Sequence, residues 1–255
     1  LLEDRPAHSS KPTALVLGHP DYDSKPNTAA PIVPEAATPI VEPITSAQPV
    51  SSTNATRSTT SPHRFDPLPA TKTEAEHLAS TFAKAFAEQT AATLLAADAS
   101  EAAFVTKAPG KTYLHLATHG YFAPEEVWKA TDAKDESPLA RLHTGRENRS
   151  AQLSPYSLAG LALAGADLPA DALGRREGIL TAQEIVHIDL SACELATLSA
   201  CKTSLGVRRA GTGLASLRQA FHAAGTRYVL ATLWEVNDAA ADALMRDFYT
   251  RVWEG

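Results

Sequence analysis

TYLHLATHGYF at residues 112–122 and ELATLSACKTSLG at residues 194–206 decide the fold of this chain. Each contains a compact apolar run that ends in small or polar residues, the pattern of a strand buried on both faces. Strands of this kind occur in parallel sheets that helices cover on both sides. The two runs therefore predict an α/β protein built on a mostly parallel central sheet.

The segments around these two runs alternate between strand and helix patterns. Further apolar runs lie at residues 13–23 and 92–96, strands are predicted within 157–165 and 227–234, and helices within 71–89, 98–108, 178–190, 214–225 and 238–253. Thr181 introduces the third of these helices, and Gly225 ends the fourth in the usual capping role. This alternation predicts a three-layer fold with right-handed crossovers and helices on both faces of the sheet.

Two regions do not follow the alternation. Residues 24–66 hold seven of the 17 prolines and many Ser, Thr and Ala residues, without apolar periodicity. Such a composition predicts a disordered, low-complexity insertion, because it buries too little surface to offset the entropy of ordering. Residues 123–178 are polar and irregular outside the short strand, which is typical of loops at an active site. We otherwise expect a single domain over residues 1–255.

Composition excludes several classes of protein. The formal net charge is −6, with Lys and Arg scattered, so a nucleic-acid partner is not expected. No apolar run approaches the ~20 residues that span a bilayer, and the first residues lack the order of a signal peptide. The two cysteines are too few for a disulfide framework. We expect a cytoplasmic protein with at least one free thiol and without a membrane partner.

His119 and Cys201 follow the two central strands, and carboxyl ends of parallel strands meet at one edge of a sheet, where ligands bind. A nucleophilic cysteine needs a base and donors for the oxyanion, and His119 is suited to be the base. The backbone N–H groups of Gly120 and Cys201 are candidate oxyanion donors. The alternative is that Cys201 is a small buried apolar residue and His119 a histidine bonded to a carbonyl group. Spacing alone leaves both interpretations open.

A metal site and a cofactor are not predicted. His115 and His119 fall on one face of a strand, but no third ligand or carboxylate is close in sequence. His115 is interpreted as a packed strand residue.

Ordered blocks along the chain resemble the CHAT domain, a bacterial caspase-like family related to separases. They are VLGHPDY (16–22), LPATKTEAEHLA (68–79), LHLATHGYF (114–122), GILTAQEI (178–185), LATLSACKTSLG (195–206), GTGLASLRQAFHAAGTRYVLATLWEVND (211–238) and ALMRDFY (243–249). The resemblance implies a caspase-like fold, with His119 and Cys201 as the catalytic pair of a cysteine peptidase that cleaves proteins or peptides. It also implies an upstream helical-repeat region in a longer protein.

The sequence departs from this family in three places. Lys202 follows the cysteine where relatives commonly carry an acidic residue. The insertion at 24–66 is unusually long, and the final helix and strand of the family are not reached before Gly255. We therefore expect a domain truncated at its C-terminal end. A caspase-like scaffold or protein-binding module with little or no catalytic activity is the alternative function.

The block LWEVND at residues 233–238 begins at the end of the strand expected at 227–234 and resembles the separase segment in which an acidic residue receives a basic side chain. By that resemblance, Asp238 is the main contact for Arg or Lys before the scissile bond, and Glu235 is the second choice. The simpler interpretation of Asp238 is a cap on the following helix.

Overall fold

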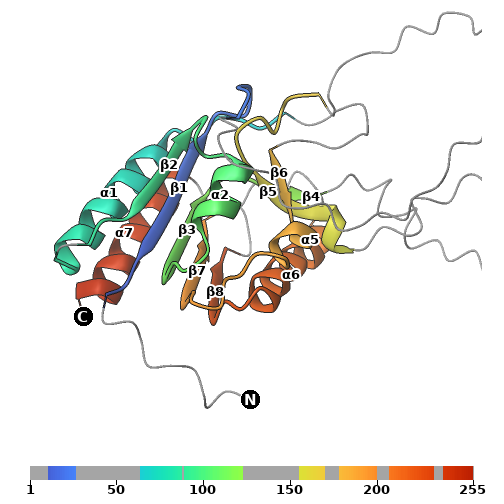
Figure 1. Ribbon diagram of the computed structural model, residues 1–255. Helices are drawn as coiled ribbons and strands as arrows, with labels where there is room; N and C mark the ends of the chain where they lie inside the picture. The colour runs from blue at the N-terminus through green and yellow to red at the C-terminus, as the bar shows by residue number, and fades with distance from the viewer. Residues whose placement is uncertain are drawn as a thin grey trace, which may run out of the picture.

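The computed structural model of the protein describes residues 11–26, 64–87, 89–122, 155–169, 178–199, 207–232 and 238–254. Its centre is a parallel five-stranded sheet in the order β2-β1-β3-β7-β8 (Figure 1). The strands are β1 (Ala14–Pro20), β2 (Ala92–Ala96), β3 (Tyr113–Ala117), β7 (Leu195–Leu198) and β8 (Tyr228–Ala231). Strand β3 lies in the middle, with β1 and β7 paired to it in parallel. The predicted parallel sheet is confirmed.

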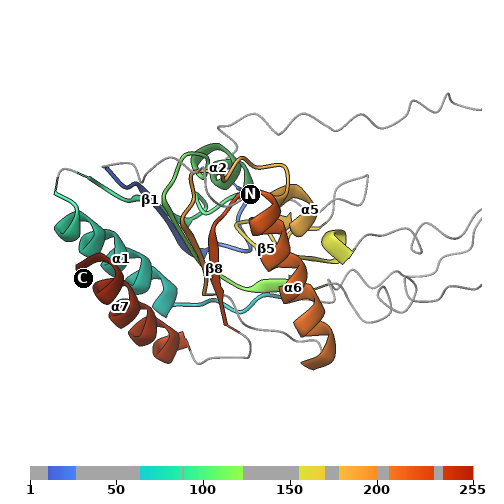
Figure 2. The ribbon, with the colours of Figure 1, turned by 90° about the horizontal axis from the view of Figure 1, so that it is seen from below.

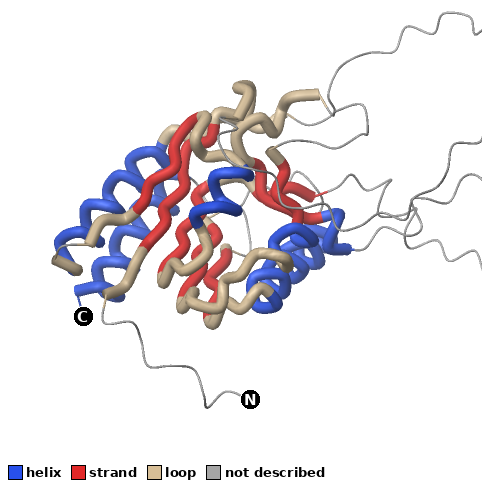
Figure 3. Tube along the Cα trace, in the orientation of Figure 1, coloured by secondary structure: helices blue, strands red, loops and turns tan. Residues whose placement is uncertain are grey.

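Helices cover the sheet on both faces, as Figure 2 shows from below. Helices α1 (Ala70–Ala85) and α7 (Asp238–Glu254) lie together on one face. Helices α2 (Glu101–Lys107) and α6 (Val207–Ala223) lie on the other face, with the short α5 (Ala182–Ile185) beside α6. The strands form the middle layer (Figure 3). This arrangement is the three-layer α/β fold that the sequence predicts.

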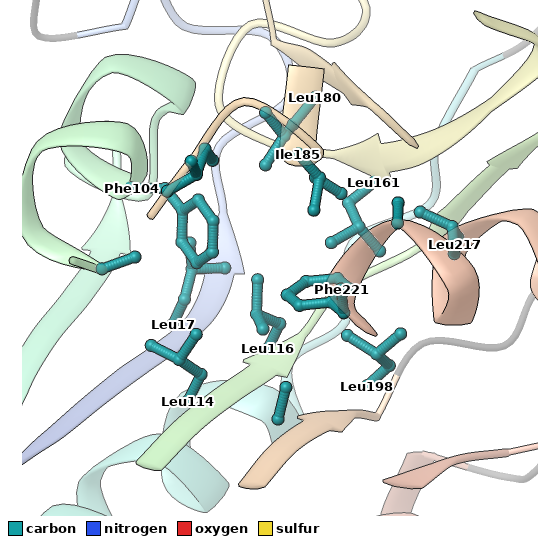
Figure 4. Packing of buried hydrophobic residues seen from close by; sticks show 14 of the residues in the cluster. Leu17, Phe104, Leu114, Leu116, Leu161, Leu180, Ile185, Leu198, Leu217 and Phe221 are labelled. Atoms are coloured by element: carbon teal, nitrogen blue, oxygen red, sulfur yellow. The ribbon is translucent and has the colours of Figure 1, made fainter. Parts of the chain in front are cut away.

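Alternate residues of β1 explain why both helical layers are needed. Leu15 and Leu17 belong to the apolar cluster under α2 and α6, whereas Ala14 and Val16 belong to the cluster under α1 and α7. All four are buried. Successive side chains of a strand point to opposite faces, so a strand that is apolar at every position requires cover on both. Figure 4 shows the larger cluster, in which side chains from both sheets and their helices meet.

A second, antiparallel sheet lies beside the first and contains three strands in the order β4-β5-β6. They are β4 (Gly120–Phe122), β5 (Ala159–Ala162) and β6 (Ile179–Thr181); the 3-10 helix η2 (Pro155–Leu158) precedes β5. The strand predicted before His119 is confirmed as β3, but β4 is not predicted. The run divides at Thr118 and His119 into β3 and β4, because β4 pairs with β5 and leaves the parallel sheet. The apolar content of a segment does not show which sheet its strand joins.

The helix ends depend on local chemistry and on packing. Thr181 caps α5 in a capping box with Glu184, and Gly225 follows α6 with φ of 111°, as the sequence predicts. Helix α6 begins at Val207, before the start predicted at residue 214, so residues 211–213 are helical as well. The weak helix propensity of glycine is overridden here by the tertiary packing of the helix face that carries Leu217 and Phe221. Within the described residues, no helix is both long enough and apolar enough to span a bilayer.

A polar pair lies buried between α1 and the central strand. The Glu74 carboxylate on α1 lies 2.8 Å from His115 Nε2 on β3, with exposed side-chain fractions of 0% and 2%. The contact is close in distance but does not meet hydrogen-bond geometry, and neither side chain has a hydrogen-bond partner among the described residues. Sequence spacing did not predict this carboxylate beside His115. A buried pair of this kind is costly to break, because the remaining partner is left without compensation.

Replacing Glu74 by Ala is expected to lower the free energy of unfolding by about 3 kcal/mol, measured by urea denaturation. The double replacement Glu74→Leu with His115→Leu should recover most of this loss, because apolar side chains need no compensating partner. Glu76→Ala is the matched control on the same helix, since Glu76 is exposed and 4.0 Å from Lys72. Its effect should stay within about 0.5 kcal/mol. Equal effects of the two alanine variants would contradict the importance of the buried pair.

Candidate functional site

The candidate site begins where β3 ends. Strand β3 stops at Ala117, and Thr118 and His119 connect it to β4, both buried. The Thr118 hydroxyl donates a hydrogen bond to the Ala162 carbonyl of β5, and Tyr22 Oη lies 3.1 Å from Thr118 Oγ1. The crossing between the two sheets is thus fixed at Thr118, immediately before His119. As the sequence predicts, His119 lies at the carboxyl end of the parallel sheet.

Among the described residues, three neighbours contact the imidazole of His119. Its Nε2 lies 2.7 Å from the backbone oxygen of Asp66. Phe65 stacks on the ring with centroids 5.6 Å apart and an interplanar angle of 28°, and Tyr22 is tilted against it at 5.6 Å. A carbonyl oxygen only accepts hydrogen bonds, so Nε2 carries the proton in this contact. In the neutral ring, the lone pair then resides on Nδ1.

The residues that contact His119 belong in part to the interval expected to be disordered. Residues 24–26 and 64–66, the two ends of that interval, are described by the structure, whereas residues 27–63 lie outside the described residues. The Phe65 N–H lies 3.1 and 3.2 Å from the two carboxylate oxygens of Asp167, and Arg64 forms an exposed 2.9 Å ion pair with Asp23. Composition could not reveal these contacts, because their partners are distant in sequence.

Helix α1 is fixed to the end of β1 immediately after this segment. The Thr71 hydroxyl donates to the Leu68 carbonyl at 2.6 Å and accepts the His19 N–H at 2.9 Å. Gly18 permits the close approach, since a Cβ atom there would lie 2.5 Å from the Thr71 carbonyl oxygen. The chain that carries the Asp66 carbonyl is therefore anchored on its helical side.

Cys201 lies outside the described residues, as do Lys202 and Glu235. The strand before it runs beside β3, and the Ser199 N–H donates to the Leu116 carbonyl at 2.9 Å. Gly120, the other candidate oxyanion donor, is buried as the first residue of β4, opposite Leu161. Asp238 is the first residue of α7, and its side chain lies outside the described part. The catalytic and substrate-binding assignments thus stay predictions.

The other cysteine has the environment of an unreactive residue. Cys193 is fully buried as a free thiol before β7. Burial raises the pKa of this thiol to about 11. A thiol with so high a pKa carries almost no thiolate near neutral pH, and the thiolate is the reactive form.

The described residues do not suggest a metal centre. No group of three or more His, Cys, Asp or Glu side chains within them is arranged to hold a metal ion. His115 faces Glu74 in the core, while His119 contacts Asp66 at the end of the sheet, so the two histidines do not form one site.

Comparison with known families gives one match. The family model described as CHAT domain matches residues 1–255, the whole chain. No curated protein matches.

The two thiols are expected to differ in their reaction with iodoacetamide. In the folded protein at pH 8, Cys193 should react slowly, because its thiolate fraction is on the order of 0.001 with a pKa near 11. Its labelling should rise with pH up to about 11. A Cys201 paired with a base should react faster than Cys193 at pH 8, but only while the fold is intact. Peptide mapping after timed alkylation measures both rates, and equal, slow labelling would argue against a reactive Cys201.

Proposed function

Because the chain belongs to the CHAT domain family, a caspase-like family related to cysteine peptidases, we propose that it is a cysteine endopeptidase with Cys201 as nucleophile and His119 as general base. The observation that carries the proposal is the hydrogen bond from His119 Nε2 to the Asp66 carbonyl, which leaves the basic lone pair on Nδ1. A base oriented by a third group in this way is typical of nucleophilic catalysis.

In the proposed reaction, His119 Nδ1 takes the proton of the Cys201 thiol. The thiolate attacks the carbonyl carbon of the scissile peptide bond, and the oxyanion accepts hydrogen bonds from the backbone N–H groups of Gly120 and Cys201. Collapse of this intermediate breaks the C–N bond, and the imidazolium gives its proton to the leaving amine. Water, deprotonated by His119, then hydrolyses the thioester and releases the thiol. No step needs a metal or a cofactor.

A scaffold or protein-binding module without catalytic activity is the second candidate, and the burial of His119 favours it. The ring is only 2% exposed and bonded to a carbonyl, as in a purely structural histidine. Family membership and the position at the carboxyl end of the central strand support the catalytic proposal over this one. A protein substrate, a cytoplasmic location and an upstream helical-repeat region belong to the same proposal, on the grounds of resemblance and cysteine usage.

Replacing Cys201 or His119 by Ala is expected to lower kcat/KM for peptide cleavage by at least about a thousand-fold, because each removes a group that acts in the transition state. Cleavage of a peptide library, followed by mass spectrometry, measures the rate, and circular dichroism checks the fold. Cys193→Ala is the matched control and should leave the rate nearly unchanged, since that thiol is buried. Undiminished cleavage by Cys201→Ala would refute the mechanism, and a wild-type chain that cleaves no peptide would favour the scaffold.

The proposed preference for Arg, then Lys, before the scissile bond depends on Asp238, with Glu235 as the second choice. Asp238→Ala should reduce the preference for Arg over Ala at this position by about 30-fold or more, because a charged partner is lost. Asp242→Ala is the matched control on the same helix, where Asp242 pairs with Arg246 at 2.7 Å. A library varied at this position measures the selectivity. Preference for Asp, or unchanged selectivity in a folded Asp238→Ala variant, would contradict the assignment.

A further inference from the structure

Asp167 is the acidic residue that joins three distant parts of the chain at the candidate site. It follows β5, and its own N–H donates to the Tyr22 carbonyl after β1 at 2.9 Å. Its carboxylate receives the Phe65 N–H at 3.1 and 3.2 Å, across 102 positions in sequence. This carboxylate thus helps to fix the segment before α1 beside the second sheet, where Phe65 also packs against Tyr22, Ala162 and Ile179.

The turn that carries Asp167 is itself held firmly. Gly165 donates to the Asp21 carbonyl at 3.0 Å and accepts from Leu168 at 3.0 Å. Gly165 has a φ of 86°, which side chains rarely adopt, and a Cβ atom there would lie 3.0 Å from Pro26 Cδ. The carboxylate is therefore presented from a fixed backbone and not from a long, adaptable side chain.

Two consecutive residues, Phe65 and Asp66, connect Asp167 to His119. The Phe65 ring stacks on the imidazole, and the carbonyl of the next residue, Asp66, accepts the proton of His119 Nε2 at 2.7 Å. Planar peptide units leave few soft torsions between the Phe65 N–H and the Asp66 carbonyl. Fixing the Phe65 N–H therefore restricts the positions that the Asp66 carbonyl can take.

We propose that Asp167 is a positioning residue for the general base: by accepting the Phe65 N–H, it keeps the Asp66 carbonyl on His119 Nε2 and so keeps the lone pair on Nδ1. Hydrogen bonds to a carboxylate are among the stronger ones, and this carboxylate is half-buried. The effect of Asp167 on the rate of peptide cleavage rests on the proposed peptidase function. Its effect on the tautomer of His119 does not.

The neighbouring ion pair provides a matched control. Arg64 and Asp23 also connect the segment before α1 to the loop after β1, at 2.9 Å, but their side chains are 76% and 66% exposed. Exposed pairs contribute little to stability or geometry. Loss of Asp23 should therefore leave the position of the Asp66 carbonyl unchanged, whereas loss of Asp167 should not.

The test is the tautomer of His119 in the full chain, read from long-range ¹H–¹⁵N correlation spectra of ¹⁵N-histidine-labelled protein at a pH where the ring is neutral. His119→Gln assigns the resonance among the nine histidines. The wild-type protein and Asp23→Ala should show the Nε2–H tautomer alone. Asp167→Ala should show a mixture of both tautomers. In cleavage assays its kcat should fall about ten- to a hundred-fold with KM little changed, since misplacement of a catalytic group acts on the chemical step.

A folded Asp167→Ala protein with the wild-type tautomer would overturn the proposal, whatever its melting temperature, because a merely structural role changes stability and not the position of the ring proton. Should Asp167→Ala fail to fold, Asp167→Ser replaces it: the hydroxyl is one bond too short to reach the Phe65 N–H, and the same mixture is expected. The wild-type tautomer in that variant would overturn the proposal equally. If the wild-type chain cleaves no peptide, the peptidase proposal fails, and the tautomer alone decides the role of Asp167.

Discussion

Burial of the parallel sheet on both faces is the constraint on which the rest of this structure depends. Strands β1 and β3 alternate residues between two apolar clusters, so neither helical layer is dispensable. The layer formed by α1 and α7 also contains the Glu74–His115 pair, which makes the seating of α1 on β3 specific as well as apolar. The position of α1 matters beyond stability. The chain that enters this helix also supplies the carbonyl group that meets His119.

The candidate site therefore combines two kinds of positioning. His119 is placed by the carboxyl end of a core strand, the edge of a parallel sheet at which ligands bind. Its ring is oriented by a backbone oxygen from the segment before α1, whose Phe65 packs against the apolar cluster of Tyr22, Ala162, Ala166 and Ile179. Polar contacts also hold that segment, and the contact of the Asp167 carboxylate with the Phe65 N–H is less exposed than the Arg64–Asp23 ion pair. A base whose tautomer is set by a main-chain group cannot lose that group by side-chain mutation at position 66; it can lose it only through displacement of the backbone.

The sequence predicts the parts of the fold that local physics determines. Apolar runs located β1, β3, β7 and β8, and cap chemistry located Thr181 and Gly225. It does not predict the division of residues 112–122 between two sheets, because β3 and β4 differ in their partners and not in their composition. It also misses Phe65 and Asp167, which meet across 102 positions and belong to stretches that look irregular. For the site, His119 is found at its predicted end of the sheet, while the pairing with Cys201 stays a prediction.

The proximity of Asp23 to Arg64 has a consequence for how the chain tolerates change. The side chains at the two ends of the intervening stretch meet at 2.9 Å, so the fold already brings those ends together. The entropy of closing a loop rises only logarithmically with its length, by roughly 0.6 kcal/mol for each doubling. The cost of closing the stretch between Asp23 and Arg64 therefore changes little with its length. This junction is the natural place to graft a reporter domain.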